Sequence, residues 1–221
     1  SCLHLSVGRP QTAEDRAGVL YRLLRTCSGA ALLGAALFSF SFAQPVPAPS
    51  PYISKPPLSH TGGWGEPTCH VCHSDGELDS PEVNVKVDGF PTRYVPGAIY
   101  PIVVSVEGPG QILAGFQASL RFLEGPSRGL QAGHLEAMDG RVVVQTGALN
   151  SVQYAHHTRE GTQLVSEERG AWQILWRAPD AEQSVILHLV VNSANGDNSP
   201  FSDLIRTSES VSQSSDDEWR N

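Results

Sequence analysis

From residue 81 onward, apolar and polar residues alternate in short runs that glycine and proline interrupt. Val83, Val85 and Val87 would share one face of the first run, because successive side chains of a strand point to opposite sides. No stretch in this region repeats with a helical period. The runs that we predict as strands are residues 82–88, 100–107, 115–123, 133–138, 141–146, 151–156, 171–177 and 184–193.

Turn signals lie between these runs. Asp139-Gly140 separates two of them and is the strongest hairpin signal in the chain, and Asn195-Gly196-Asp197 is predicted to be a turn. Trp172 and Trp176 alternate with polar positions, so we expect both to supply core area. Many short strands separated by turns are typical of an antiparallel β-sandwich, which we place at residues 81–206. The polar, acidic residues 207–221 are predicted to be a disordered tail.

The first part of the chain is predicted to direct export. Arg16, Arg22 and Arg25 precede an apolar run that ends on the small-residue pattern Ser41-Phe42-Ala43. This order is typical of a cleaved signal peptide, so we assign residues 1–43 to it. The chain begins with Ser1 rather than Met, and we predict no structure ahead of Arg16. An uncleaved anchor is the alternative, since the run is near the lower length limit for crossing a bilayer. The proline-rich residues 44–59 are predicted to be an extended linker.

Charge narrows the range of partners. The whole chain has a formal charge of -8, and cleavage after Ala43 would remove four basic and two acidic residues, leaving about -10. An acidic surface is unsuited to nucleic acid, because phosphate contacts need lysine and arginine. We expect a protein partner with a basic docking face.

Cleavage would also leave only two cysteines, in the sequence Cys69-His70-Val71-Cys72-His73. This C-x-x-C-H pattern attaches haem in c-type cytochromes. Two thiols at this spacing reach the two vinyl groups on one edge of the porphyrin, and the next histidine ligates the iron. We therefore predict one covalent haem c, held by residues 60–80 through Cys69 and Cys72 with His73 as proximal ligand. A zinc site and a disulfide are the alternatives.

The second axial ligand determines the chemistry of the iron. The side chains that we considered are His60, His70, His134, His156, His157, His188 and Met138. His70 lies inside the attachment loop, His188 lies among core positions of a strand, and Met138 reads as a core gap-filler. His156 and His157 leave a strand together, so one of them can enter a pocket while the other stays in water. The sequence pattern alone does not choose between His156 and His157 as the distal ligand, and Met138 is a further alternative.

Seven different short motifs follow one another along the chain. They are Gly62-Gly63-x-Gly65-Glu66-x-Thr68-Cys69-x-x-Cys72-His73, Tyr94-x-Pro96-Gly97-x-x-Tyr100, Gly115-Phe116-Gln117, Ala132-Gly133, Tyr154-x-x-His157-Thr158, Trp176-x-Ala178-Pro179 and Asn192-x-Ala194-Asn195-Gly196-Asp197. The series spans residues 60–205 and resembles bacterial exported proteins that carry a C-x-x-C-H segment ahead of a reeler-like β-sandwich. The resemblance implies an immunoglobulin-like sandwich with the haem segment packed on it. It also places the family's His-Thr pair on His157-Thr158, which favours His157 over His156.

The expected function is one-electron transfer by an exported monohaem c-type cytochrome with two histidine ligands. It would act in the periplasm or at the cell surface, as a soluble carrier or as a subunit of an envelope redox complex. The alternative is an extracellular binding or structural sandwich in which the two cysteines form a disulfide or zinc clasp. A haem enzyme or sensor would need an open iron position. The sequence contains no nucleophile elbow, H-E-x-x-H motif or phosphate-binding loop, so electron transfer is favoured over catalysis.

Overall fold

Two β-sheets pack against each other in the computed structural model, which describes residues 51–215. The first sheet has four antiparallel strands in the order β1-β3-β8-β5. Their bounds are Asn84–Asp88 (β1), Ile99–Glu107 (β3), Arg169–Arg177 (β8) and His134–Ala137 (β5). The predicted signal peptide and residues 44–50 of the predicted linker lie outside the described residues.

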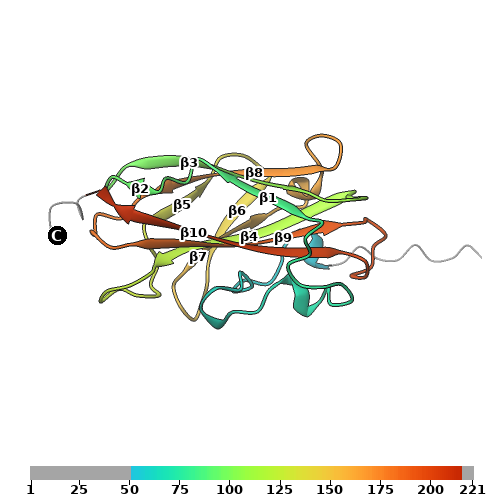
Figure 1. The fold of residues 1–221 in the computed structure, drawn as a ribbon, viewed down its shortest axis with the longest axis horizontal. Helices are drawn as coiled ribbons and strands as arrows, with labels where there is room; N and C mark the ends of the chain where they lie inside the picture. Colours follow the sequence, from blue (N-terminus) through green and yellow to red (C-terminus); the bar gives the residue numbers. More distant parts are fainter. Residues whose placement is uncertain (1–50, 216–221) are drawn as a thin grey trace, which may run out of the picture. The chain divides into compact units, whose positions relative to one another are not determined.

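The second sheet has six strands in the order β2-β10-β9-β4-β7-β6 (Figure 1). Their bounds are Arg93–Tyr94 (β2), Leu204–Ser214 (β10), Val185–Ala194 (β9), Leu113–Phe122 (β4), Gln153–His157 (β7) and Val142–Thr146 (β6). Only the short contact between β2 and β10 is parallel. The predicted all-β, immunoglobulin-like sandwich is therefore confirmed.

The core lies between the sheets and is rich in aromatic side chains. Trp176 is fully buried and packs against Tyr94 and Tyr100, with ring centroids 5.5 and 5.6 Å away. Trp172 stacks on Phe116 at 4.5 Å. Both tryptophans occupy the core as predicted, and each indole N–H donates to a backbone carbonyl, which satisfies the polar atom that burial would otherwise strand.

The predicted hairpin at Asp139-Gly140 is wrong. Strand β5 before it pairs with β8 in the four-stranded sheet, whereas β6 after it pairs with β7 in the six-stranded sheet. The turn therefore carries the chain from one sheet to the other. Arg141 fixes this crossing by donating to the carbonyls of Ala171 and Gly161 at 3.2 Å.

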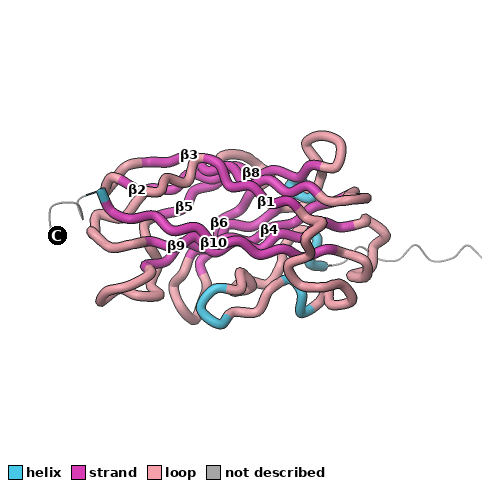
Figure 2. Tube along the Cα trace, in the orientation of Figure 1, coloured by secondary structure: helices cyan, strands magenta, loops and turns pink. Residues whose placement is uncertain are grey.

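The predicted disordered tail is also wrong for residues 207–214. These residues form most of β10, which pairs with β9 along its length. The predicted turn at Asn195-Gly196-Asp197 is confirmed, since Gly196 has a positive φ and the Asn195 side chain accepts the Asp197 N–H. Within residues 51–215, no helix is long and apolar enough to cross a membrane. The helical pieces there are single 3-10 turns: Pro51–Ile53 (η2), Gly63–Gly65 (η3), Cys69–Val71 (η4) and Glu160–Thr162 (η5) (Figure 2).

The outer face of the six-stranded sheet is covered rather than exposed. In β4, Gln117, Ser119 and Arg121 alternate with core residues and are nevertheless buried. The segment 51–80 lies along this face, below the strands in Figure 1. Gln117 holds it by donating to the Pro57 carbonyl at 2.9 Å and accepting the His60 N–H at 2.8 Å. This covering segment contains the C-x-x-C-H motif.

Candidate haem site

A buried ionic cluster anchors the covering segment. The Glu66 carboxylate pairs with the Arg121 guanidinium from β4 and accepts hydrogen bonds from the hydroxyls of Tyr154 and Thr61, at 2.5 and 2.7 Å. Burial by itself would raise the pKa of Glu66, but these hydrogen bonds and the Arg121 charge outweigh it and lower the pKa below its usual 4.5. Glu66 is therefore ionised at neutral pH and fixes the segment three residues ahead of Cys69.

Close packing brings the same segment down onto the sheet. A Cβ atom at Gly63 would lie 2.3 Å from the imidazole of His188, so only glycine lets the backbone pass there. His188 is buried beneath it on β9 and faces Glu209 at 3.3 Å. The strand position predicted for His188 is correct, and its role is to support the segment.

One 3-10 turn gathers the C-x-x-C-H residues. The Thr68 hydroxyl caps η4 by accepting the His70 N–H at 3.2 Å. The N–H groups of Cys72 and His73 then both donate to the Cys69 carbonyl, at 3.2 and 3.1 Å. This compact turn places Cys69, Cys72 and His73 on the wall of one cavity of about 370 Å³.

The cavity brings together the predicted site residues from distant parts of the sequence. His157 on β7 lines it together with Cys69, Cys72 and His73. Apolar walls come from Ile53, Leu113, Ala114, Phe116 and the prolines of residues 56–57. Its volume is within the range of small-molecule and cofactor pockets, about 300–1,000 Å³.

His73 is oriented by a carboxylate. Its Nδ1 lies 2.8 Å from Oδ2 of Asp203, a residue that is only 2% exposed. In this arrangement the Nδ1–H donates to Asp203, and the Asn192 amide nitrogen lies 3.4 Å from both ring nitrogens of His73.

His157 is seated at the end of the pairing between β4 and β7. Its ring lies over Gly115, where an added Cβ would come within 2.9 Å of it. Its Nδ1 accepts the Phe116 N–H at 3.0 Å and lies 3.2 Å from the Phe116 oxygen. Burial lowers the pKa of His157 to about 4, although backbone hydrogen bonds with Phe116 and Tyr52 oppose it. The imidazole is therefore neutral at pH 7, which is the form that ligates metals.

The other distal candidates have different surroundings. His156 is fully buried away from the cavity lining, and its ring nitrogens lie 2.9 Å from the His157 carbonyl and 3.2 Å from Gln145 Oε1. Met138 is 45% exposed and does not fill a core gap, so that prediction is wrong. His60, however, does line the cavity, with its Nδ1 2.8 Å from the Leu58 carbonyl. The structure thus gathers His157 and His60 with His73, and leaves His156 and Met138 apart.

The two cysteines are not joined to each other. Burial raises the pKa of the Cys69 thiol to about 12. Zinc would need four ligands around one point, and residues 51–215 contain no group of three or more His, Cys, Asp and Glu side chains arranged to hold a metal ion.

The residues at the cavity match the requirements of haem c. Two thiols at C-x-x-C spacing lie beside His73, the imidazole of His157 on β7 lines the same cavity, and much of its wall is apolar. Imidazole ligands, covalent sulfur attachment and a low-polarity pocket are the elements through which proteins hold and tune haem. The donor set therefore fits haem c better than a four-ligand zinc site.

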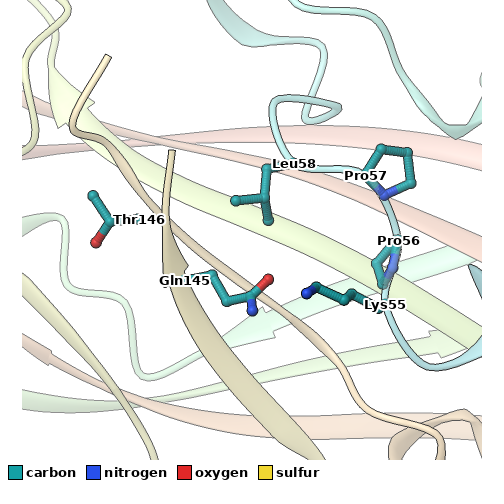
Figure 3. Close-up of a pocket in the computed structure, with 6 residues that line it drawn as sticks. All are labelled: Lys55, Pro56, Pro57, Leu58, Gln145 and Thr146. Atoms are coloured by element: carbon teal, nitrogen blue, oxygen red, sulfur yellow. The ribbon is translucent and has the colours of Figure 1, made fainter. Parts of the chain in front are cut away.

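A second, open groove lies beside this cavity and shares its proline wall (Figure 3). It has a volume of about 580 Å³ and is lined by Lys55, Pro56, Pro57, Leu58, Gln145 and Thr146. Lys55 is its sole charged side chain, and the lining contains no acid–base pair or nucleophile with an activating partner. We assign it no chemistry.

The sequence predictions missed two elements of the site, Asp203 and the cluster around Glu66. Glu66 lies in the first motif of the series. Arg121 is a charged residue in a strand whose other residues are almost all buried. These two signals together indicate a buried pair. Asp203 has no comparable local signal, because its partner His73 is distant in the sequence.

Comparisons with known proteins bear on the fold. No protein-family profile matches the chain, and no curated protein matches it. Among solved structures it is similar to the human F-spondin reeler domain, at 21% identity and a TM-score of 0.41 over 62% of this chain and 95% of that one. A Reelin-N domain of F-spondin matches at 20% identity and a TM-score of 0.41, over 65% and 96% of the two chains. A cohesin module from a Clostridium perfringens family 33 glycoside hydrolase matches at 9% identity and a TM-score of 0.40, over 61% and 98%. The β-sandwich rests on the strand pairing described above, and no function follows from these likenesses.

Proposed function

We propose that this chain is an exported monohaem c-type cytochrome that transfers single electrons. The observation that carries the proposal is the convergence of Cys69, Cys72, His73 and His157 on one largely apolar cavity. When bound, haem supplies one iron that cycles between Fe(III) and Fe(II).

Each residue has a defined part in this proposal. The thiols of Cys69 and Cys72 would each add across a vinyl group, forming one C–S bond and transferring the thiol hydrogen to the neighbouring carbon. His73 and His157 would hold the iron through their imidazole nitrogens. Phe116 and Leu113 would keep water from the iron. Two protein ligands would leave the iron no open position for a substrate, which favours electron transfer over catalysis.

Covalent attachment is tested by expressing the full chain, leader included, with a c-type maturation system. We expect the absorption spectrum of haem c and a mass increase equal to one haem, because both thiol hydrogens are retained. Cys69→Ser/Cys72→Ser should remove covalent haem completely. Val71→Ala, in the same turn but 64% exposed, should leave attachment unchanged. A parent protein with no covalent haem would contradict the cytochrome, and a bound zinc ion or a Cys69–Cys72 disulfide would replace it with the binding-module alternative.

The surroundings of the cavity support a basic redox partner. Val71 and Phe201 are exposed apolar side chains in two loops that contribute to the cavity wall. The same loops carry the exposed carboxylates of Asp75 and Asp197, and the Asp75 carboxylate accepts the Ser202 N–H at 2.6 Å, which joins the loops. An apolar contact with two carboxylates in the same loops suits a partner with a basic face.

Electron transfer to a basic c-type cytochrome as acceptor should therefore depend on salt. We expect the second-order rate, measured by stopped flow, to fall about 10-fold or more between about 0.01 M and about 1 M salt, as the screening length drops from about 30 Å to about 3 Å. An acidic acceptor is the control, and its rate should not fall. A rate with the basic acceptor that does not change with salt would contradict acidic steering.

A further inference from the structure

A buried carboxylate lies directly behind the predicted proximal ligand. Asp203 immediately precedes β10 and is 2% exposed. Its Oδ2 is 2.8 Å from His73 Nδ1. Burying a carboxylate without partners costs free energy, so the groups that surround Asp203 should indicate its role.

Both oxygens of Asp203 are fixed by neighbouring groups. The Asn195 N–H donates to Oδ1 at 3.1 Å, and the Asn192 side-chain amide donates to Oδ2 at 3.3 Å. Ile205, two residues on, is buried in the core and holds the start of β10. The carboxylate therefore cannot rotate freely, and Oδ2 stays directed at His73.

We infer that Asp203 is a positioning residue that fixes the His73 ring and tunes the iron through it. This inference rests on the proposed function. The hydrogen bond from Nδ1 selects the tautomer in which Nε2 carries no hydrogen. Together with the Asn192 amide nitrogen, 3.4 Å from both ring nitrogens, it holds the plane of the ring. A carboxylate on the far nitrogen also makes the ligating nitrogen more basic. A more electron-rich ligand stabilises Fe(III) over Fe(II), so Asp203 lowers the reduction potential.

The reduction potential separates this role from a purely structural ion pair. Asp203→Asn retains a hydrogen-bond acceptor for His73 but removes the negative charge, and Asp203→Ala removes both. We expect the potential to rise in Asp203→Asn and to rise further in Asp203→Ala. Asp79→Asn is the control, because the Asp79 carboxylate accepts a backbone N–H of β10, that of Thr207 at 2.7 Å, without contacting His73. Potentials in both Asp203 variants equal to that of the parent would overturn the inference.

A second readout needs no haem. In the full-length Cys69→Ser/Cys72→Ser chain, ¹⁵N NMR should show His73 with its hydrogen on Nδ1, and Asp203→Ala in that background should give a mixture of tautomers. An unchanged tautomer in Asp203→Ala would overturn the positioning role. If the parent protein carries no haem, the proposed function fails, and the NMR result alone then decides whether Asp203 positions His73.

Discussion

His157→Ala is expected to convert a low-spin, six-coordinate haem into a high-spin haem that binds carbon monoxide when reduced. His157 is the candidate from β7 that reaches the cavity, and the pKa of about 4 keeps its imidazole neutral and able to ligate. Removing the ring opens one axial position, and small ligands bind to ferrous haem there. Oxidised and reduced absorption spectra, with and without carbon monoxide, measure the change.

Added imidazole and two other histidines provide the controls for this variant. Free imidazole should enter the space left by the ring and restore the low-spin spectrum of His157→Ala, which separates loss of a ligand from loss of folding. His156→Ala should stay low-spin, since His156 is outside the cavity lining. A low-spin His157→Ala together with a high-spin His60→Ala would assign the axial position to His60 and contradict His157.

Most of the sandwich could be predicted from alternation because its strands bury one apolar face. The positions of Trp172 and Trp176 followed from the same rule. Strand β10 did not, because residues 208–214 are nearly all polar and small. This strand is held mainly by backbone pairing with β9, and the buried residues at its end, Ser212 and Ser214, bring little apolar area. A strand that is held by backbone hydrogen bonds to its neighbour has no alternating apolar pattern, so the sequence does not predict it.

The error at Asp139-Gly140 has a similar origin. A two-residue turn signal says that the chain reverses or bends there, but it does not say which sheet receives the next strand. That choice depends on Arg141, whose guanidinium binds carbonyls of β8 and of η5. Such contacts join residues about 20–30 positions apart, beyond the reach of a local pattern.

The candidate site divides in the same way. Cys69, Cys72 and His73 form a contiguous motif whose chemistry is set by spacing, so sequence alone could propose them. His157 could be preferred over His156 only through the resemblance to a known family, because a His-Thr pair by itself indicates no particular chemistry. Asp203 could be found only from the structure, since its carboxylate meets His73 only when the start of β10 lies beside the covering segment.

The largest effect on stability is expected at Glu66. Glu66→Ala would leave the Arg121 guanidinium, whose side chain is 6% exposed, without its counter-charge. Breaking a buried ion pair from one side costs about 3–5 kcal/mol. Denaturant unfolding followed by circular dichroism should show a loss of this size. Glu209→Gln is the matched control, because Glu209 is 63% exposed beside His188 and should cost at most about 1 kcal/mol.

Acid should reproduce part of this loss in the parent protein. The pKa of Glu66 is lower in the folded chain than its usual 4.5, so its ionised form favours the folded state. The contribution is complete above the unfolded value and is lost as the pH falls through the lowered folded value. Glu66→Gln cannot titrate, so the stability difference between parent and variant should shrink as the pH falls below about 4.5. A difference that stays constant from pH 7 to acid would show that the Glu66 charge does not anchor the covering segment.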